Sequence, residues 1–79
     1  MSREAIYEKL TEVFVDVFDD EDIVISDETT AADIEGWDSL THISLIASVE
    51  DEFDIKFDMK AIQGLKNVGE MVSIIEGLI

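Results

Sequence analysis

The hydroxyl group best placed for chemistry is that of Ser39, in the stretch GWDSL at positions 36–40. This stretch separates a long acidic loop from a strongly helical run over 41–53. Ser39 is therefore expected in the first turn of a helix, where unpaired backbone N–H groups and the positive end of the helix dipole favour an anion. A serine placed there can cap the helix, attack a substrate or carry a phosphate-linked group.

Catalysis by Ser39 would need a base and an orienting acid close to its hydroxyl. The chain has a single histidine, His42, about one turn further along the same predicted helix. The sequence around Ser39 lacks the G-x-S-x-G spacing of a nucleophile elbow, and 79 residues leave little material to enclose a substrate cleft. We interpret His42 as a helix-surface residue and predict that the protein is not an enzyme.

The acidic run Asp19–Asp22 raises the question of a calcium site. An EF-hand loop needs oxygen ligands at alternating positions, a glycine at the sixth position and a glutamate at the twelfth. Counted from Asp20, the fifth and sixth positions are Val24 and Ile25, and counting from Asp19 gives no better match. We therefore predict no structured metal site.

The composition describes a small folded domain over residues 1–79. The chain is 47% hydrophobic, which is too apolar for a disordered acidic tail, and too short for two independent cores. It has no cysteine, so any thiol that takes part in the function must come from a cofactor. With neither a signal peptide nor a long apolar run, the sequence predicts a soluble, cytoplasmic protein that does not enter the membrane.

Twenty acidic residues against five basic ones give a formal net charge of −15. Nucleic acid is excluded as a partner, because its phosphates would repel such a chain. The charge favours partner proteins with basic docking patches. It is equally compatible with a simple role in keeping a small monomeric protein in solution, and charge alone does not separate the two interpretations.

The pattern of caps and apolar residues predicts an all-α fold: a small antiparallel bundle of three main helices plus one short helix. The predicted helices cover 3–18, 39–53, 59–63 and the segment that begins at Asn67. Gly64 is expected to close the short helix, and Glu70 stands three residues after Asn67 in capping-box spacing. The predicted N-caps are Ser2, Asp38, Asp58 and Asn67.

Apolar residues recur at spacings of three and four in the three main helices, as expected for a buried stripe. The predicted stripes are Ile6, Leu10, Val13, Phe14 and Val17; Leu45, Ile46, Val49 and Phe53; and Val68, Met71, Val72, Ile75, Leu78 and Ile79. The second helix has a further apolar line, Leu40, Ile43 and Ala47. This line fits either the core or an exposed docking strip, and periodicity does not distinguish them.

The segment 19–37 is long for a loop in so small a domain. Its acidic start ends the first helix, because the dipole disfavours negative charge at a helix C-terminus. Thr30 is predicted to cap one short turn over 31–33. We expect an ordered loop that apolar side chains pin across the end of the bundle: Ile23, Val24, Ile25, Ile34 and Trp37.

Asp38-Ser39-Leu40, followed by a helix that ends in VEDEF at 49–53, closely resembles the acyl carrier protein family, and the resemblance extends over essentially the whole chain. It implies that Ser39 carries 4′-phosphopantetheine, attached as a phosphodiester by a separate phosphopantetheinyl transferase from coenzyme A. The terminal thiol of this arm would hold acyl groups as thioesters. Asp38 and Leu40 belong to the same motif, with Asp38 as the expected cap.

The resemblance also implies partner enzymes that load and process the acyl group. Thr41, His42 and Ser44 stand where fatty-acid carriers are often acidic, and the Gly36-Trp37 pair is more similar to carriers of specialised acyl, polyketide or aminoacyl pathways. The pathway and cargo therefore stay open. The docking surface is predicted at Leu40, Ile43 and Ala47, flanked by Glu50 and Asp51. The alternative is an acidic helical adaptor that binds partners without modification.

Overall fold

The computed structural model describes all 79 residues and contains no β-strand. The chain folds into α1 (Arg3–Phe18), a 3-10 turn η1 (Ala31–Asp33), α2 (Ser39–Phe53), α3 (Met59–Gln63) and α4 (Val68–Leu78). The predicted all-α fold, the helix bounds and the short turn after Thr30 are confirmed. None of the helices has the length and apolar content needed to span a membrane.

Polar side chains cap the start of every α-helix at the predicted positions. Ser2, Asp38, Asp58 and Asn67 each accept a hydrogen bond from a backbone N–H two or three residues later, which satisfies donors that the helix leaves free. The predicted capping box of α4 is only half formed. The Glu70 carboxylate reaches one residue further back and accepts from the N–H of Lys66 at 2.8 Å.

The C-terminal ends of α1 and α2 share an unusual feature. Each closes on an aspartate in the left-handed conformation, Asp19 with φ of 51° and Asp54 with φ of 54°. Aspartate tolerates this region better than most residues do, although its charge lies at the negative end of the dipole. Gly64 closes α3 as predicted, but with φ of −93°, so that end does not use a left-handed residue.

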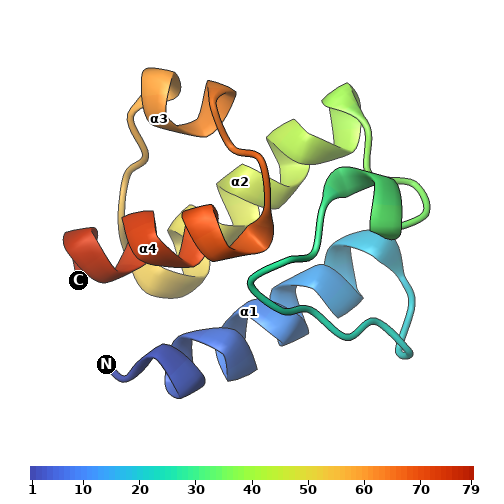
Figure 1. Cartoon of the computed structure of the whole chain (residues 1–79), viewed down its shortest axis with the longest axis horizontal. Coiled ribbons are helices and arrows are strands. Elements are labelled where there is room, and N and C mark those ends of the chain that lie inside the picture. The colour runs from blue at the N-terminus through green and yellow to red at the C-terminus, as the bar shows by residue number, and fades with distance from the viewer.

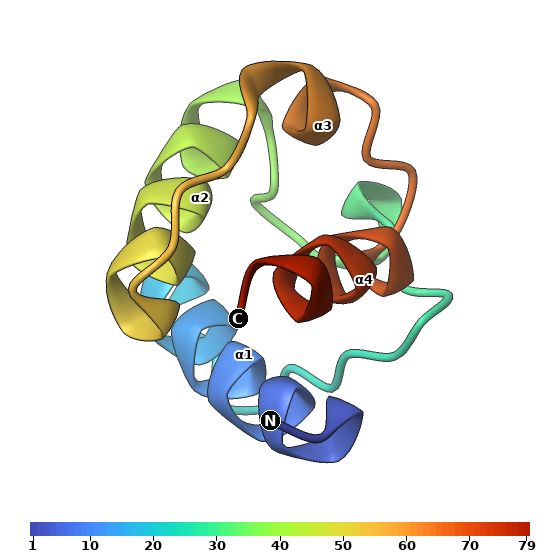
Figure 2. The ribbon, with the colours of Figure 1, turned by 90° about the vertical axis from the view of Figure 1, so that its left-hand side faces the viewer.

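The helices follow one another around the outside of the molecule, with α2 between α1 and α3 (Figures 1 and 2). α4 faces them from the inside of this curve (Figure 2). The long connection between α1 and α2 passes the start of α4 before it reaches α2 (Figure 1). This path brings the loop and the first turn of α4 together.

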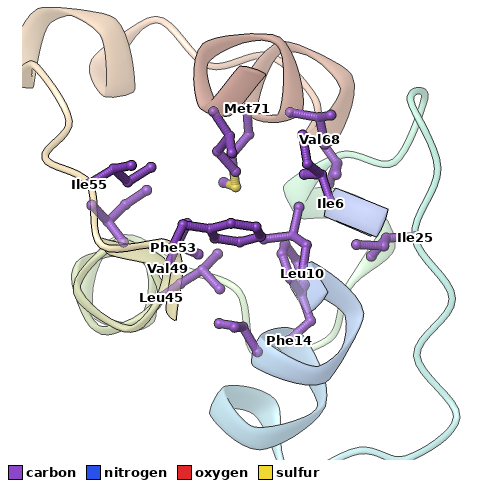
Figure 3. Packing of buried hydrophobic residues seen from close by; sticks show 14 of the residues in the cluster. Ile6, Leu10, Phe14, Ile25, Leu45, Val49, Phe53, Ile55, Val68 and Met71 are labelled. Atoms are coloured by element: carbon purple, nitrogen blue, oxygen red, sulfur yellow. The ribbon is translucent and has the colours of Figure 1, made fainter. Parts of the chain in front are cut away.

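One core joins α1, α2 and α4. Figure 3 shows side chains of these helices directed toward a common centre, among them Leu10, Phe53 and Met71. The predicted stripes of α1 and α2 are confirmed, apart from Val17, which is half-buried at the edge of the core. Ile25, Ile34 and Ile55 add buried side chains from the connecting segments.

Three apolar residues predicted to pack inward lie outside the core. Val24 is 83% exposed, because neighbouring residues of an extended segment point to opposite sides and Ile25 takes the inward direction. Leu78 and Ile79 are 46% and 49% exposed. They lie in the last turn of α4 and beyond it, at the outer edge of the molecule (Figure 1).

The loop before η1 is joined to the start of α4 by the backbone. The N–H of Val68 donates to the carbonyl of Thr29 at 2.8 Å, and the N–H of Gly69 donates to the carbonyl of Asp27 at 3.1 Å. Gly69 permits this close approach, since a β-carbon there would lie 2.8 Å from the Asp27 carbonyl oxygen. A larger residue at position 69 would force the two backbones apart.

Charged and hydroxyl groups reinforce the same junction. The guanidinium of Arg3 pairs with Asp27 at 2.8 Å and also with Glu76 of α4. The Tyr7 hydroxyl donates to the same Asp27 carboxylate. We call this set, Arg3, Tyr7, Asp27, Gly69 and Glu76, the α1–α4 clamp.

Candidate functional site

The first turn of α2 is fixed by reciprocal hydrogen bonds between Asp38 and Thr41. The Asp38 carboxylate accepts from the N–H groups of Leu40 and Thr41, both at 3.0 Å. The Thr41 hydroxyl accepts from the N–H of Asp38 at 2.7 Å and donates to the carbonyl of Gly36 at 2.7 Å. Sequence reasoning found Asp38 as the cap but missed Thr41, because Thr41 stands where the capping-box signal has Glu or Gln.

The turn before α2 depends on Gly36. Its φ is 88°, in the left-handed region that L side chains rarely adopt. A β-carbon at this position would meet nothing closer than 3.9 Å, so the backbone conformation and not the space requires glycine. The turn places Trp37 against the bundle and leaves Ser39 on the outside.

Ser39 is exposed at the first position of α2, and its hydroxyl makes no hydrogen bond within the protein. The helix-cap interpretation of this serine is therefore wrong, because Asp38 takes that role. The expectation of several free N–H groups for a phosphate also needs correction. The Asp38 carboxylate already occupies the N–H groups of Leu40 and Thr41.

These hydrogen bonds change the acidity of the cap. Donation from the N–H of Thr41, and then from that of Leu40, holds the pKa of Asp38 below its ordinary value. Asp38 therefore stays ionised at neutral pH and continues to fix the turn. The ionised Asp38 places a negative charge beside Ser39, and this charge would repel a phosphate attached to the serine.

Trp37 and His42 form a pair next to Ser39. The indole N–H of Trp37 donates to Nδ1 of His42 at 3.1 Å, and the two rings lie nearly parallel, with an interplanar angle of 19° and centroids 6.0 Å apart. Trp37 also packs edge-on against Phe14 of α1, with ring centroids 5.3 Å apart. His42 was predicted as a helix-surface residue. It lies at the surface of α2 as predicted but is half-buried against Trp37, because the turn at Gly36 folds the indole back over the first turns of α2.

An open groove of about 930 Å³ lies between α2 and α3. Ser39, Trp37 and His42 line its end nearest the start of α2. Its apolar walls come from α2 and from the region of α3: Ile43, Ile46, Ala47, Met59, Ile62 and Leu65. Ser39 thus stands at the edge of a mostly apolar space.

A second hollow, of about 610 Å³, lies around the α1–α4 clamp, where Arg3 and Gly69 form part of its wall. It is away from Ser39, and Arg3, its only basic group, is already paired with carboxylates. No three His, Asp or Glu side chains converge as a metal site would require. The groove beside Ser39 is therefore the better candidate site.

The predicted docking residues fall into two groups. Leu40 and Ile43 are 78% and 69% exposed, and Ala47 and Asp51 are exposed as well. Glu50 differs, because it is half-buried and its carboxylate accepts from the N–H of Phe57 at 2.8 Å. It connects α2 to the segment that leads to α3, a role that the sequence did not reveal.

The surroundings of Ser39 fit a covalent arm. The hydroxyl is free of hydrogen bonds, the position is exposed, and the adjoining groove provides space along α2. The cap and the Gly36 turn hold the backbone on both sides of the serine without using its side chain. A group attached there would leave the local hydrogen bonds intact.

Comparison with known proteins agrees with this geometry. A family model described as "Phosphopantetheine attachment site" matches residues 8–75. An acyl carrier protein of Streptococcus pyogenes is 35% identical over 72 residues, which cover 91% of this chain and 93% of the relative. That of Thermotoga maritima is 31% identical over 75 residues, covering 95% and 93%. The solution NMR structure of a holo acyl carrier protein from Geobacter metallireducens superimposes with a TM-score of 0.84 at 45% identity, over 90% of this chain and 82% of that one.

The chain therefore belongs to the acyl carrier protein family of phosphopantetheine-attachment proteins. Membership confirms the predicted cofactor, a covalently attached 4′-phosphopantetheine. It also confirms that the protein is a carrier and not an enzyme. Interaction with a phosphopantetheinyl transferase and with biosynthetic enzymes follows for the family in general.

Proposed function

We propose that residues 1–79 act as one carrier domain and that Ser39 is the attachment point of 4′-phosphopantetheine. The thiol of that arm holds an acyl group as a thioester, which partner enzymes of fatty-acid, polyketide or related acyl or aminoacyl biosynthesis act on in turn. The main support is that Ser39 has an exposed hydroxyl without a hydrogen bond, while Asp38 performs the capping. The resemblance of Asp38-Ser39-Leu40 to the family motif points to the same residue.

The side chains around Ser39 have separate tasks in this proposal. Asp38 and Thr41 fix the first turn of α2 and so present the hydroxyl outward. Thr41 also holds the preceding turn through the carbonyl of Gly36. The serine is then available to a transferase without any rearrangement of the helix.

The docking surface follows α2 from its start. Leu40, Ile43 and Ala47 supply exposed apolar area, and Asp51 supplies a free negative charge further along. A basic patch on a partner would be steered by the charge and held by the apolar side chains. Glu50 contributes less directly, because its carboxylate is engaged by the N–H of Phe57.

The attachment site is tested by intact mass spectrometry after incubation with coenzyme A and a broad-specificity transferase. Ser39→Ala is expected to abolish the phosphopantetheine mass gain and to keep its helical circular dichroism. Ser44→Ala is the matched control, because Ser44 is also exposed on α2 but lies outside the motif.

The outcome separates the proposal from its alternative. A Ser39→Ala variant that still gains the full mass would place the arm on another residue. A wild-type chain that gains no mass would favour the unmodified acidic adaptor.

A further inference from the structure

The contact between Trp37 and His42 determines where the imidazole carries its proton. The indole nitrogen of tryptophan can only donate a hydrogen bond, so Nδ1 of His42 must accept and has no proton. In the neutral ring the single proton is then on Nε2. Trp37 therefore turns His42 into a hydrogen-bond donor of fixed orientation.

That donor has no partner within the protein. Nε2 of His42 makes no hydrogen bond, and both ion pairs of the molecule belong to Arg3, so no carboxylate oxygen lies within 4.0 Å of the imidazole nitrogens. The molecule also has no buried side-chain nitrogen without a partner, so Nε2 is open to solvent. His42 lines the groove, and a ligand there can therefore reach its N–H.

The other polar side chains of the groove do not provide a hydrogen-bond donor of fixed orientation. Asp38 and Glu50 are carboxylates, which accept hydrogen bonds and repel carbonyl oxygens. Gln63 can donate, but it is exposed on the opposite wall and has no contact that fixes its amide. The bond from Trp37, between two nearly parallel rings, holds the His42 donor in one orientation among apolar side chains.

Ser39 and His42 are three residues apart on α2 and so lie on the same side of the helix. A group tethered to Ser39 would be present near His42 at high effective concentration. Such a group brings several acceptor oxygens near His42: those of the phosphodiester at Ser39 itself and, further along the arm, the carbonyl oxygens of its amides and of any thioester that it bears.

We propose that Trp37 and His42 form a binding site for an acceptor oxygen of the group tethered at Ser39, a phosphodiester or carbonyl oxygen, with Nε2–H of His42 as the donor and Trp37 as the residue that fixes its tautomer. This inference rests on the proposed attachment at Ser39. It adds a polar anchor at the start of an otherwise apolar groove. The anchor keeps the tethered group along α2 and out of bulk water.

The test uses protein labelled with ¹⁵N in histidine, and the ¹⁵N chemical shifts themselves report which ring nitrogen carries the proton. The imidazole signals are recorded for the unmodified chain, for the chain loaded from coenzyme A, and for the chain loaded from an acyl-coenzyme A. Intact mass and a peptide map establish first that each loaded sample is fully modified at Ser39. The spectra of the single histidine then need no further assignment.

The unmodified chain is expected to show the Nε2–H tautomer. Loading should shift the Nε2 proton downfield and slow its exchange with water by up to about tenfold, the factor for a hydrogen bond of about 1.4 kcal/mol. A change in both loaded samples identifies an acceptor of the arm itself, and the ³¹P signal of the arm then separates the two sources: a ³¹P shift that His42→Phe reverses indicates the phosphodiester, and an unchanged one indicates an amide carbonyl. A change with the acyl-loaded sample alone identifies the thioester carbonyl.

Two variants separate the anchor from simple packing. Trp37→Phe keeps an aromatic ring but removes the donor to Nδ1, so the tautomer preference and the loading shift should both weaken. His42→Phe keeps an aromatic ring at this position and removes the anchor, so nuclear Overhauser contacts between the arm and Ile46 should decrease. Both variants should still gain the full mass.

A fully loaded wild-type chain whose Nε2 signal matches that of the unmodified chain would overturn the acceptor site and leave the carrier assignment intact. Failure of the mass gain at Ser39 would overturn both proposals, and the mass spectrum alone would show it. An Nδ1–H tautomer in the unmodified chain would remove the basis of the site.

Discussion

The two sides of this small molecule are built differently. On the α1–α4 side, backbone hydrogen bonds, the Gly69 contact and the carboxylate of Asp27 join three segments that are distant in sequence. On the α2–α3 side, α3 contributes no buried residue, and its Met59 is 67% exposed. Leu40 and Ile43 are exposed on the same side.

Because of this difference, the contacts that stabilise the bundle lie in one part of the molecule and the candidate site in another. Regions with few buried contacts open more easily than the core, and here such a region borders Ser39 and the groove. The α1–α4 clamp lies away from this site, so it can hold the bundle together without restricting access to the serine. Variants on the two sides should therefore have distinct effects.

The largest expected effect comes from Gly69→Ala. The added β-carbon would lie 2.8 Å from the Asp27 carbonyl oxygen and 3.0 Å from its Cα, and backbone atoms cannot move aside as a flexible side chain would. We expect a loss of about 1–3 kcal/mol in the free energy of unfolding, the range for overpacked sites. Urea unfolding followed by circular dichroism measures it.

Gly77→Ala is the matched control on the same helix. A β-carbon at Gly77 would meet nothing within 4 Å, so the substitution should leave stability unchanged or raise it by up to about 1 kcal/mol through helix propensity. Equal unfolding midpoints for the two variants would show that the loop at Asp27 yields and that the clamp is not rigid.

A smaller effect is expected from Glu50→Ala on the α2–α3 side. The variant removes the acceptor of the Phe57 N–H and should lower the free energy of unfolding by about 1 kcal/mol. Asp51→Ala, at an exposed neighbour without such a bond, should have little effect on stability. If the two variants unfold at the same urea concentration, the link between α2 and the α3 segment contributes nothing.

Docking of partner enzymes should be more sensitive to changes on the α2–α3 side than to changes on α1. Asp51→Lys, on the open side, is expected to slow loading by the transferase more than Glu12→Lys on α1, because it reverses charge next to the exposed strip. The difference should shrink as salt rises. Initial loading rates measured by mass spectrometry test this, and equal slowing by both variants would leave net charge as the only determinant.

Salt and pH act on both sides together, with the smallest expected effects. Fifteen surplus negative charges repel one another, so added salt should raise the melting temperature by screening. Modest acidification from neutral should do the same. A melting temperature that is independent of salt, or one that peaks well above pH 7, would contradict this explanation.

Three groups with shifted pKa values set the limits of that trend. The Tyr7 hydroxyl and then Arg3 hold the pKa of Asp27 below its usual value, as the N–H of Thr41 does for Asp38. Their contributions to stability are fully present above the ordinary aspartate pKa of about 3.9 and are lost as pH falls through the lower folded values.

Burial, with the bond to Asp27, raises the pKa of Tyr7 to about 12. Its contribution is complete below its ordinary pKa of about 10 and is lost as pH rises through the folded value. Stability should therefore peak on the acid side of neutral, above pH 4.

The sequence was sufficient to predict the helices and the position of Ser39. Caps and apolar spacing are local signals, so Asp38 and Asn67 marked helix starts that the structure reproduces. The motif at Asp38-Ser39-Leu40 indicated the family that the comparisons confirm. Periodicity left the line Leu40, Ile43 and Ala47 undecided between core and surface, and only the structure shows it exposed.

What the sequence did not reveal depends on contacts across turns. The bond from Trp37 to His42 requires the left-handed turn at Gly36, which no periodic pattern encodes. The bond between Glu50 and Phe57 likewise depends on how the chain leaves α2. The exposure of Leu78 follows from where α4 ends relative to the core, although its spacing fits the buried stripe.

The two sides of the molecule can also be observed separately without any label. The chain has one tyrosine and one tryptophan. Tyr7 belongs to the α1–α4 clamp, whereas Trp37 lies beside Ser39 and the groove. The ring proton NMR signals of the tyrosine and the fluorescence of the indole thus follow different regions of the same chain. A partner that opens the groove while the clamp stays closed would change the emission and leave the tyrosine signals as they were.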